Sequence, residues 1–271
     1  MKKKKACIFA HYDQDCLIDD YVIYFLKSLK NVCVKIVFVS DCDLLETEFS
    51  KIEEIVDVII AGRHGEYDFG SYKRGYLLLK DDLQSYDELI FCNDSCYGPF
   101  FPFEEIFFSM NDKKVDFWGL TANFFGLEKS KSIFNKSYKL STDSYHLQSY
   151  FVVLKSNVFT SIVFADFICG VSKQNQKEEI IVKYEIGFTK VLMESGFVCD
   201  SYIPFFKDIS NITISRWREI LLFKHPFPFV KIGLLKNLPT EEYVAGWEYF
   251  LSQNFKYDTK LINNHLNRIS K

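Results

Sequence analysis

Residues 6–40, ACIFAHYDQDCLIDDYVIYFLKSLKNVCVKIVFVS, contain the pattern that decides the fold. A short β-favouring run, ACIFA, ends at the polar segment HYDQD, and apolar residues then recur at helical spacing in DDYVIYFLKSLK. The run from Val34 to Ser40 is continuous and β-branched, as expected for a strand that is covered on both faces. The stretch therefore predicts a strand, a loop, a helix and a second strand, which is the unit of a parallel sheet.

The same alternation continues toward the C-terminus. The pattern predicts a helix over residues 44–55, a strand over 56–61, a helix over 72–83 and a strand over 88–93. We therefore expect an α/β fold, with a mostly parallel sheet flanked by helices.

The second half of the chain is less regular. We expect strands over residues 116–121 and 146–155, a flexible loop over 123–143, a helix over 156–170 and a helix that opens near Tyr184. Helix-like stretches follow the segment HPFPF, and no internal repeat marks a second unit. We assign residues 1–235 to one α/β domain and residues 236–271 to a helical extension packed on it.

Composition excludes several classes of protein. The chain has 271 residues, 48% of them hydrophobic, a net charge of -3 and a pI near 6.0, so it lacks the basic field that attracts nucleic acid. Its 8 cysteines are scattered and form no C-x-x-C pair, which favours reduced thiols in the core over a zinc or redox site. The N-terminus lacks the apolar segment of a signal peptide, and no apolar run is long enough for a membrane helix. We expect a soluble cytoplasmic protein.

Polar segments follow three of the predicted strands. They are HYDQD after the first strand, RHGEYDFGS after the third and NDSCYGP after the fourth. Ligands of parallel sheets bind beyond the carboxyl ends of the strands. The three segments are therefore expected to converge on one ligand site.

The segment NDSCYGPF is the most informative of the three. Asn93, Asp94 and Ser95 end a strand before a turn at Gly98 and Pro99, which places a carboxylate at the sheet edge. There Asp94 could bridge Mg²⁺ or Mn²⁺ to a diphosphate, because both ions prefer oxygen ligands. The alternative is that Asp94 only forms an Asx-turn.

The segment GRHGEYDFGSYKRG combines Gly62, Gly65, Gly70 and Gly75 with basic side chains at the entry to a helix. Glycine-rich loops let backbone amides approach phosphates. The segment matches neither the dinucleotide fingerprint nor the Walker loop. A plain helix start with a solvated basic face is the alternative.

Glu185, in VKYEIGFT, is the candidate general base, because a carboxylate there can accept a proton from an acceptor hydroxyl. A first-turn glutamate that is stabilised by the helix dipole is the other interpretation. His146 and Gln148 are equally open to a binding or a structural role. His225, just before Pro226, is a candidate second metal ligand.

Taken together, these segments resemble the rhamnan synthesis protein F family of bacterial glycosyltransferases. The strings that carry the resemblance occur in order between about residues 6 and 235: AHYDQDCLIDDYVIYFL, VFVS, GEYDFGSYKRGY, YDELIFCNDSCYGPFFP, DFWGLT, HLQSYFVVLK, KYEIGFT, GF and HPFPFVK. The resemblance implies a GT-A-like fold. It also implies transfer of a sugar such as rhamnose or galactose during synthesis of a rhamnan, O-antigen or capsule.

The resemblance also implies roles for individual residues. Asp94 is similar to the acidic motif that holds the metal and diphosphate, although N-D-S replaces the usual D-x-D. A UDP- or dTDP-sugar is the implied donor, with Asn93 and Ser95 beside it. His11, Tyr12 and Asp13 are expected near the base or ribose. Residues expected near the rest of the donor are Arg63, Tyr67, Asp68 and Lys73, and those on the acceptor side are His146, Gln148 and Ser149.

We therefore expect an inverting hexosyl or deoxyhexosyl transferase that acts on a lipid-linked or polysaccharide acceptor. The alternative from another class is a non-catalytic glycan-binding or scaffolding subunit of a polysaccharide assembly complex. The N-terminal lysines and the basic, aromatic C-terminus suggest a peripheral contact with an anionic membrane. A solvated end with a packed terminal helix explains the same residues.

Overall fold

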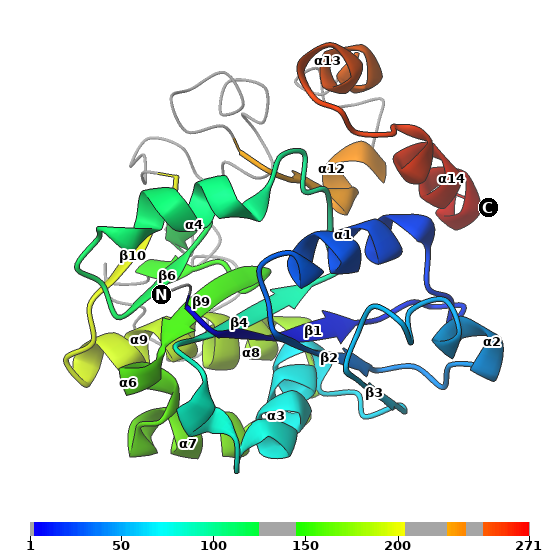
Figure 1. Cartoon of the computed structure of the whole chain (residues 1–271). Coiled ribbons are helices and arrows are strands. Elements are labelled where there is room, and N and C mark those ends of the chain that lie inside the picture. Colours follow the sequence, from blue (N-terminus) through cyan, green and yellow to red (C-terminus); the bar gives the residue numbers. More distant parts are fainter. Residues whose placement is uncertain (1–2, 125–144, 204–226, 237–245, 271) are drawn as a thin grey trace, which may run out of the picture.

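The computed structural model describes residues 3–124, 145–203, 227–236 and 246–270. A seven-stranded sheet in the order β10-β6-β9-β4-β1-β2-β3 forms the centre of the molecule, and helices cover both of its faces (Figure 1). The predicted α/β architecture, a mostly parallel sheet flanked by helices, is confirmed.

Four parallel strands from the first half of the chain form one side of the sheet. They are β1 (Lys5–His11), β2 (Lys35–Ser40), β3 (Val58–Ala61) and β4 (Glu88–Asn93). Every residue of β1 and β4 is buried, which explains their continuous apolar sequences. The register pairs Ala10 with Asn93 and His11 with Ser40. The carboxyl ends of these strands therefore lie side by side.

The other side of the sheet is mixed. Strand β9 (Phe151–Lys155) runs antiparallel to β4 and to β6 (Phe117–Gly119), whereas β10 (Cys199–Ser201) is parallel to β6. The single strand predicted over 146–155 is wrong. It is divided between β9 and β8 (Tyr145–Leu147), which pairs with β7 (Ala122–Phe124) in a separate ribbon.

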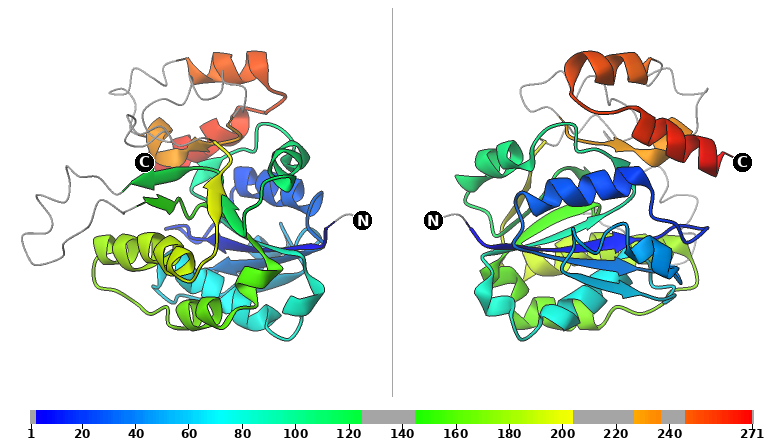
Figure 2. Two further views of the ribbon diagram at one scale, coloured as in Figure 1. Left: turned by 90° about the vertical axis from the view of Figure 1, so that its left-hand side faces the viewer. Right: turned by 45° about the vertical axis from the view of Figure 1, so that its right-hand side comes forward.

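Two apolar layers hold the helices on the sheet. Along β1, Cys7 and Phe9 face one layer and Ile8 the other, because side chains of a strand alternate. The first layer includes α1 (Asp20–Lys30) and α4 (Phe103–Asn111), and α4 was not predicted. The second includes α3 (Tyr67–Leu79), α7 (Ile162–Cys169) and α9 (Gly187–Glu194). Figure 2 shows the sheet between the two sets of helices.

Several predicted helix boundaries need correction. The helix expected over 44–55 is the short α2 (Glu46–Phe49), and the helix expected from Tyr72 starts at Tyr67 and ends at Leu79, before a 3₁₀ turn at Leu83–Ser85. The helix expected over 156–170 is divided into α6 (Ser156–Phe159) and α7. The Ser161 hydroxyl accepts a hydrogen bond from the amide of Phe164 at 3.2 Å and caps the second piece.

The C-terminal segments contact the rest of the molecule. Strand β11 (Val230–Lys231) pairs antiparallel with β5 (Cys96–Tyr97), and α12 (Ile232–Lys236) follows it. Helices α13 (Trp247–Asn254) and α14 (Lys260–Ile269) come last, and α14 lies beside α1 (Figure 1). The predicted division at residue 235 stays a prediction.

The cysteines are free thiols, and Cys7, Cys33 and Cys92 are buried in the core. This confirms the prediction that these three behave as small apolar residues. Across the residues that the structure describes, no helix is both long and apolar enough to cross a membrane.

Candidate functional site

A cavity of about 230 Å³ opens at the carboxyl end of β4. Residues from α3, the end of β4, the β8–β9 turn, the helical segment before α9 and β11 surround it. Its lining consists of Tyr67, Asp68, Phe69, Asn93, Ser95, Gln148, Ser149, Tyr150, Ile180, Ile181, Glu185 and Lys231. Five separate parts of the chain therefore meet at the edge where the sequence predicts a ligand site.

Seven of the predicted site residues line this cavity: Tyr67, Asp68, Asn93, Ser95, Gln148, Ser149 and Glu185. The remaining predicted residues that the structure describes lie outside the lining: His11, Tyr12, Asp13, Arg63, Lys73, Asp94 and His146. His225 lies outside the described residues. The roles given to all of these residues stay predictions.

A chain of hydrogen bonds crosses the floor of the cavity. The Lys231 Nζ donates to Ser95 Oγ at 2.9 Å, and Ser95 Oγ donates to Asn93 Oδ1 at 2.6 Å. The Asn93 Nδ2 then donates to Asp68 Oδ2 at 2.7 Å. The chain thus connects a cation to a carboxylate and fixes the orientation of the Asn93 amide between them.

Glu185 reaches the cavity from an unusual piece of helix. Helix α8 (Lys177–Ile180), a π-helical segment (Ile181–Ile186) and α9 follow one another without a break. The expectation that a helix opens near Tyr184 is therefore wrong, and with it the interpretation of Glu185 as a first-turn residue. A π-helical turn widens the backbone and often occurs at functional sites. Here Ile181 and Glu185, four residues apart, both face the cavity.

Another wall comes from the turn between β8 and β9. The Thr121 hydroxyl donates to Gln148 Oε1 at 2.7 Å, and the Tyr72 hydroxyl donates to the Ser149 carbonyl oxygen at 3.0 Å. These bonds hold Gln148 and Ser149 at the cavity. His146 is buried within β8, opposite Asn123, and does not line it.

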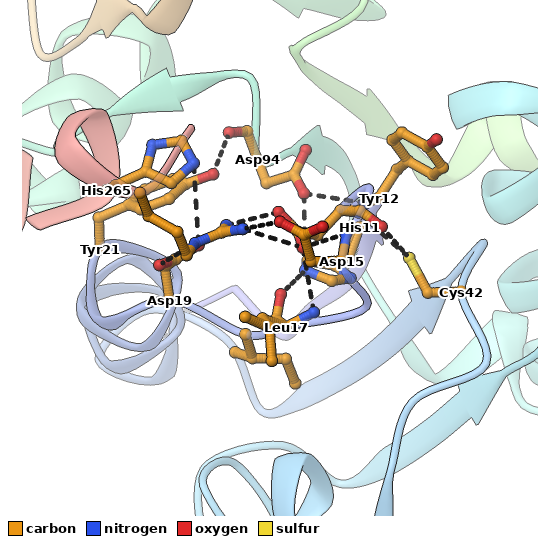
Figure 3. Close-up of polar contacts among 12 residues, drawn as sticks. His11, Tyr12, Asp15, Leu17, Asp19, Tyr21, Cys42, Asp94 and His265 are labelled. Atoms are coloured by element: carbon orange, nitrogen blue, oxygen red, sulfur yellow. Dashed lines mark hydrogen bonds and ion pairs between the residues drawn. The ribbon is translucent and has the colours of Figure 1, made fainter. Parts of the chain in front are cut away.

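Asp94 follows β4 directly, and its carboxylate is held by the first loop. The Tyr12 backbone N–H donates to Asp94 Oδ2 at 2.9 Å, and the Tyr21 hydroxyl donates to the Asp94 carbonyl oxygen at 3.0 Å (Figure 3). Burial raises the pKa of Asp94 well above its usual range, and the charges of Asp68 and Asp13 add to this effect. Asp94 thus ties the loop after β1 to the end of β4.

His11 is a buried part of the same loop. Its Nε2 donates to the Leu17 carbonyl oxygen at 3.2 Å, and its Nδ1 lies 2.9 Å from Ser40 Oγ. Burial lowers the pKa of His11 to about 4, so the ring is neutral at pH 7. The ring therefore fixes the loop, whereas the side chain of Tyr12 is 56% exposed and accessible to a ligand.

The glycine-rich segment is folded differently from the expected phosphate loop. The amides of His64 and Gly65 donate to Asp41 Oδ1 at 2.5 and 2.9 Å, so a carboxylate of the protein already takes these donors. Gly70 and Gly75 lie inside α3. A Cβ on Gly75 would stand 2.4 Å from Ile8, so this glycine lets α3 approach β1. The interpretation as a phosphate-binding loop is therefore wrong.

Two basic residues of this segment also have partners in the protein. The Arg63 side chain is exposed and lies 3.3 Å from Asp43 Oδ2. The Lys73 Nζ donates to the Val171 carbonyl oxygen at 2.7 Å, which ties α3 to the end of α7.

A second polar group, the arginine cluster, consists of Asp13, Asp15, Asp19 and Arg268. The Arg268 guanidinium donates to Asp13 Oδ2 at 2.5 Å, to Asp15 Oδ2 at 2.9 Å and to Asp19 Oδ2. Burial is the largest influence on the pKa of Asp13 and raises it, but the hydrogen bonds from Arg268 and from the amides of Leu17 and Asp15, together with the charge of Arg268, lower this pKa overall. Asp13 of this cluster lies close enough to Asp94 for its charge to raise the pKa of Asp94.

These contacts bear on the predicted cation site. Within the described ranges, the group with spacing suited to three ligands is Asp13, Asp19 and His265, and Arg268 already bonds to both carboxylates. Asp94 offers a single carboxylate, which accepts the Tyr12 amide. Divalent cations need several oxygen ligands. The described residues therefore do not form a cation site on protein ligands alone.

Sequence reasoning missed Lys231, Tyr150 and Arg268. Lys231 ends HPFPFVK, one of the strings of the resemblance, but no sequence signal pairs that segment with residues 96–97. Arg268 lies in a terminal helix whose partner loop is more than 250 residues away. These contacts depend on tertiary structure, which local patterns do not show.

The chain is similar to known proteins in sequence and in structure. The family model described as rhamnan synthesis protein F matches residues 36–271. The virulence protein VirA of Vibrio anguillarum is 28% identical over 305 residues, with 97% of this chain and 91% of that protein covered. An uncharacterized protein, y4gN, of Sinorhizobium fredii is 28% identical over 199 residues, or 72% of this chain. The chain spans about half of that relative, 49% of its length.

A similar solved structure is the mannosyltransferase Ktr4p from S. cerevisiae in complex with GDP. The sequence identity is 13% and the TM-score is 0.37, with 62% of this chain and 60% of that chain covered.

Proposed function

Because the chain belongs to the rhamnan synthesis protein F family, we propose that it is a glycosyltransferase of bacterial surface polysaccharide synthesis. It transfers a hexose or deoxyhexose, of rhamnose or galactose type, from a nucleoside diphosphate sugar to a growing polysaccharide. The observation that carries the proposal is the cavity itself: Glu185 shares it with Asp68, Asn93 and Ser95 at the carboxyl end of β4.

The cavity supports a direct displacement. Glu185 takes the proton of an acceptor hydroxyl, and the acceptor oxygen forms a bond to the anomeric carbon. The bond between that carbon and the β-phosphate oxygen breaks, and its electron pair leaves with the nucleoside diphosphate. A single displacement inverts the anomeric configuration. No step is assigned to a metal ion.

The polar walls of the cavity fit the two substrates. Gln148 and Ser149 form the wall that comes from the β8–β9 turn, and amide and hydroxyl side chains of this kind bind sugar hydroxyls. We assign this wall to the acceptor, and the end of β4 to the donor. Tyr67 lies at the rim with a φ of 56° and an exposed ring. A side chain in this backbone conformation is strained, which is common where a residue has a binding role.

The Glu185→Gln variant tests the proposal. Because glutamine cannot accept the proton, we expect kcat to fall by about 10²- to 10⁴-fold, with little change in donor affinity. The assay incubates the protein with UDP- and dTDP-sugars and a polysaccharide acceptor, and follows the anomeric proton by NMR, which also reports inversion.

Glu179→Gln is the matched control, because Glu179 lies in the same helical stretch but is exposed. This variant should turn over at the rate of the unmodified protein. A near-normal kcat for Glu185→Gln would remove Glu185 from the mechanism. A protein that binds none of the sugar nucleotides at micromolar concentration would instead be a scaffolding subunit.

A further inference from the structure

The Lys231 ammonium is the one cation among the described residues that line the cavity. Its Nζ donates to Ser95 Oγ at 2.9 Å and lies 4.3 Å from the centroid of the Tyr150 ring. The charged neighbours in the lining are the carboxylates of Asp68 and Glu185. Lys231 is therefore the lining residue whose charge suits an anionic ligand.

The backbone fixes Lys231 at this place. In the β5–β11 pair, Lys231 is opposite Cys96, and the Ile232 amide donates to the Ser95 carbonyl oxygen at 3.1 Å. The Phe100 amide donates to the Pro228 carbonyl oxygen at 2.9 Å. Gly98 permits this approach, because a Cβ there would stand 2.4 Å from the same oxygen.

The hydrogen-bond chain also determines which group donates and which accepts between Lys231 and Ser95. A serine hydroxyl has one proton, and that of Ser95 goes to Asn93 Oδ1, so Ser95 can only accept from Lys231. An ammonium has three N–H donors, of which Ser95 accepts one. The Tyr150 ring stabilises the charge from one side. The remaining donors suit an oxyanion in the cavity.

Resting on the proposed function, we propose that Lys231 binds the diphosphate of the donor and neutralises the nucleoside diphosphate as it leaves. Negative charge grows on the β-phosphate oxygen when its bond to the anomeric carbon breaks. A fixed cation beside that oxygen lowers the barrier. This role matters here because the described residues do not form a cation site around Asp94 on their own.

Nucleotide binding tests this assignment without any acceptor. UDP, dTDP and GDP are titrated calorimetrically into the unmodified protein, and the nucleotide that binds is compared with its nucleoside. In Lys231→Met, we expect the Kd of the diphosphate to rise about 10- to 100-fold, the range for loss of a hydrogen bond to a charged group. The Kd of the nucleoside should not change, and Lys231→Arg should recover part of the affinity.

Two further variants keep the result interpretable. Lys231→Gln retains an N–H donor for Ser95 Oγ but has no charge, so it separates the charge from the β5–β11 packing. Lys236→Met is the matched control, because Lys236 is exposed at the end of α12. We expect Lys231→Gln to behave like Lys231→Met, and Lys236→Met like the unmodified protein.

The titrations have three outcomes that separate this inference from the proposed function. If the unmodified protein binds a diphosphate and both uncharged variants bind it equally well, the role of Lys231 is overturned and the proposed function stands. If the variants lose diphosphate and nucleoside affinity in parallel, Lys231 shapes the cavity and the proposal is also overturned. If the unmodified protein binds none of the nucleotides, the proposed function fails and this inference fails with it.

Discussion

In the arginine cluster, one guanidinium from α14 bonds to three carboxylates of the loop before α1. In the cavity, one ammonium donates to a serine hydroxyl and shares the lining with two carboxylates. Both regions lie near the carboxyl ends of the strands, because Asp13 and Asp15 follow β1 and the cavity opens at the end of β4. In the cluster, the charges compensate one another within the protein. In the cavity, polar groups line a space that can hold a ligand. A high density of charge is therefore a poor guide to the binding site, and the direction of the hydrogen bonds is a better one.

The largest expected effect comes from removing the guanidinium from the cluster. Arg268→Gln leaves Asp13 and Asp19, both largely buried, with no opposite charge. Removing one partner of a buried ion pair costs about 3–5 kcal/mol, and the partial exposure of Arg268 reduces this to about 2–4 kcal/mol. Urea unfolding measures the loss. Arg63→Gln is the matched control and should change stability by less than about 1 kcal/mol, because its pair with Asp43 is exposed.

The stability of the folded protein should also depend on pH through the Asp13–Arg268 ion pair. Burial raises the pKa of folded Asp13, but Arg268 and the Leu17 and Asp15 amides together lower it below its unfolded value, which is about 3.9. The stability that Asp13 contributes is therefore present above the unfolded pKa and is lost as the pH falls through the lower, folded pKa. We expect the unmodified protein to lose stability below about pH 4, and Arg268→Gln to show a flatter profile there. Parallel profiles would mean that Arg268 does not act through Asp13.

The comparison also explains what local sequence could predict. The buried strands β1, β2 and β4 were found because a strand covered on both faces is apolar throughout. The polar segment after β4 led to Asn93 and Ser95, and the family resemblance led to Asp68. Glu185 was found as a residue, but the π-helical backbone that presents it was not. A sequence pattern with a 3.6-residue period does not show a single wider turn.

Lys231 and Arg268 were missed for a different reason. Each acts on a segment far away in the sequence: Lys231 is 136 residues from Ser95, and Arg268 is 255 residues from Asp13. Lys231 ends an apolar run and Arg268 lies in the last turn of a polar helix, and neither setting shows that the first residue lies in the cavity and the second compensates the cluster. For the glycine-rich segment, the sequence predicted a phosphate-binding loop that the structure does not contain. The amides of this segment bond to Asp41, a residue outside the segment.

A smaller effect is expected at Asp94, between the two regions. Its folded pKa is raised by burial and by the charges of Asp68 and Asp13, so ionisation at neutral pH favours the unfolded chain. Asp94→Asn removes this penalty and can still accept the Tyr12 amide. We expect a melting temperature a few degrees higher at pH 7, at roughly 2–4 °C for each kcal/mol gained.

The gain should disappear below about pH 4, where aspartate is protonated in both states. Transfer by Asp94→Asn should fall at the same time, because a residue kept at the expense of stability usually has a role in function. A lower melting temperature at pH 7 would show instead that the Asp94 charge stabilises the fold. Unchanged transfer would remove Asp94 from the donor site.

The smallest expected effect is at Tyr12, whose backbone belongs to the loop held by Asp94 and whose ring is exposed. Figure 3 shows the ring directed away from Asp19 and His265. An aromatic ring at this edge can stack on a nucleobase, an interaction worth about 1–3 kcal/mol. We expect Tyr12→Ala to raise the Kd of both the nucleotide and its nucleoside about 5- to 10-fold, at the lower end of that range. Tyr249→Ala is the control, because Tyr249 is similarly exposed on α13.

The nucleoside is the informative ligand: its affinity should depend on Tyr12 and not on Lys231, because stacking acts on the base and the ammonium on the phosphates. If Tyr12→Ala left nucleoside binding intact, the loop after β1 would not contact the base, and all binding determinants would lie in the cavity.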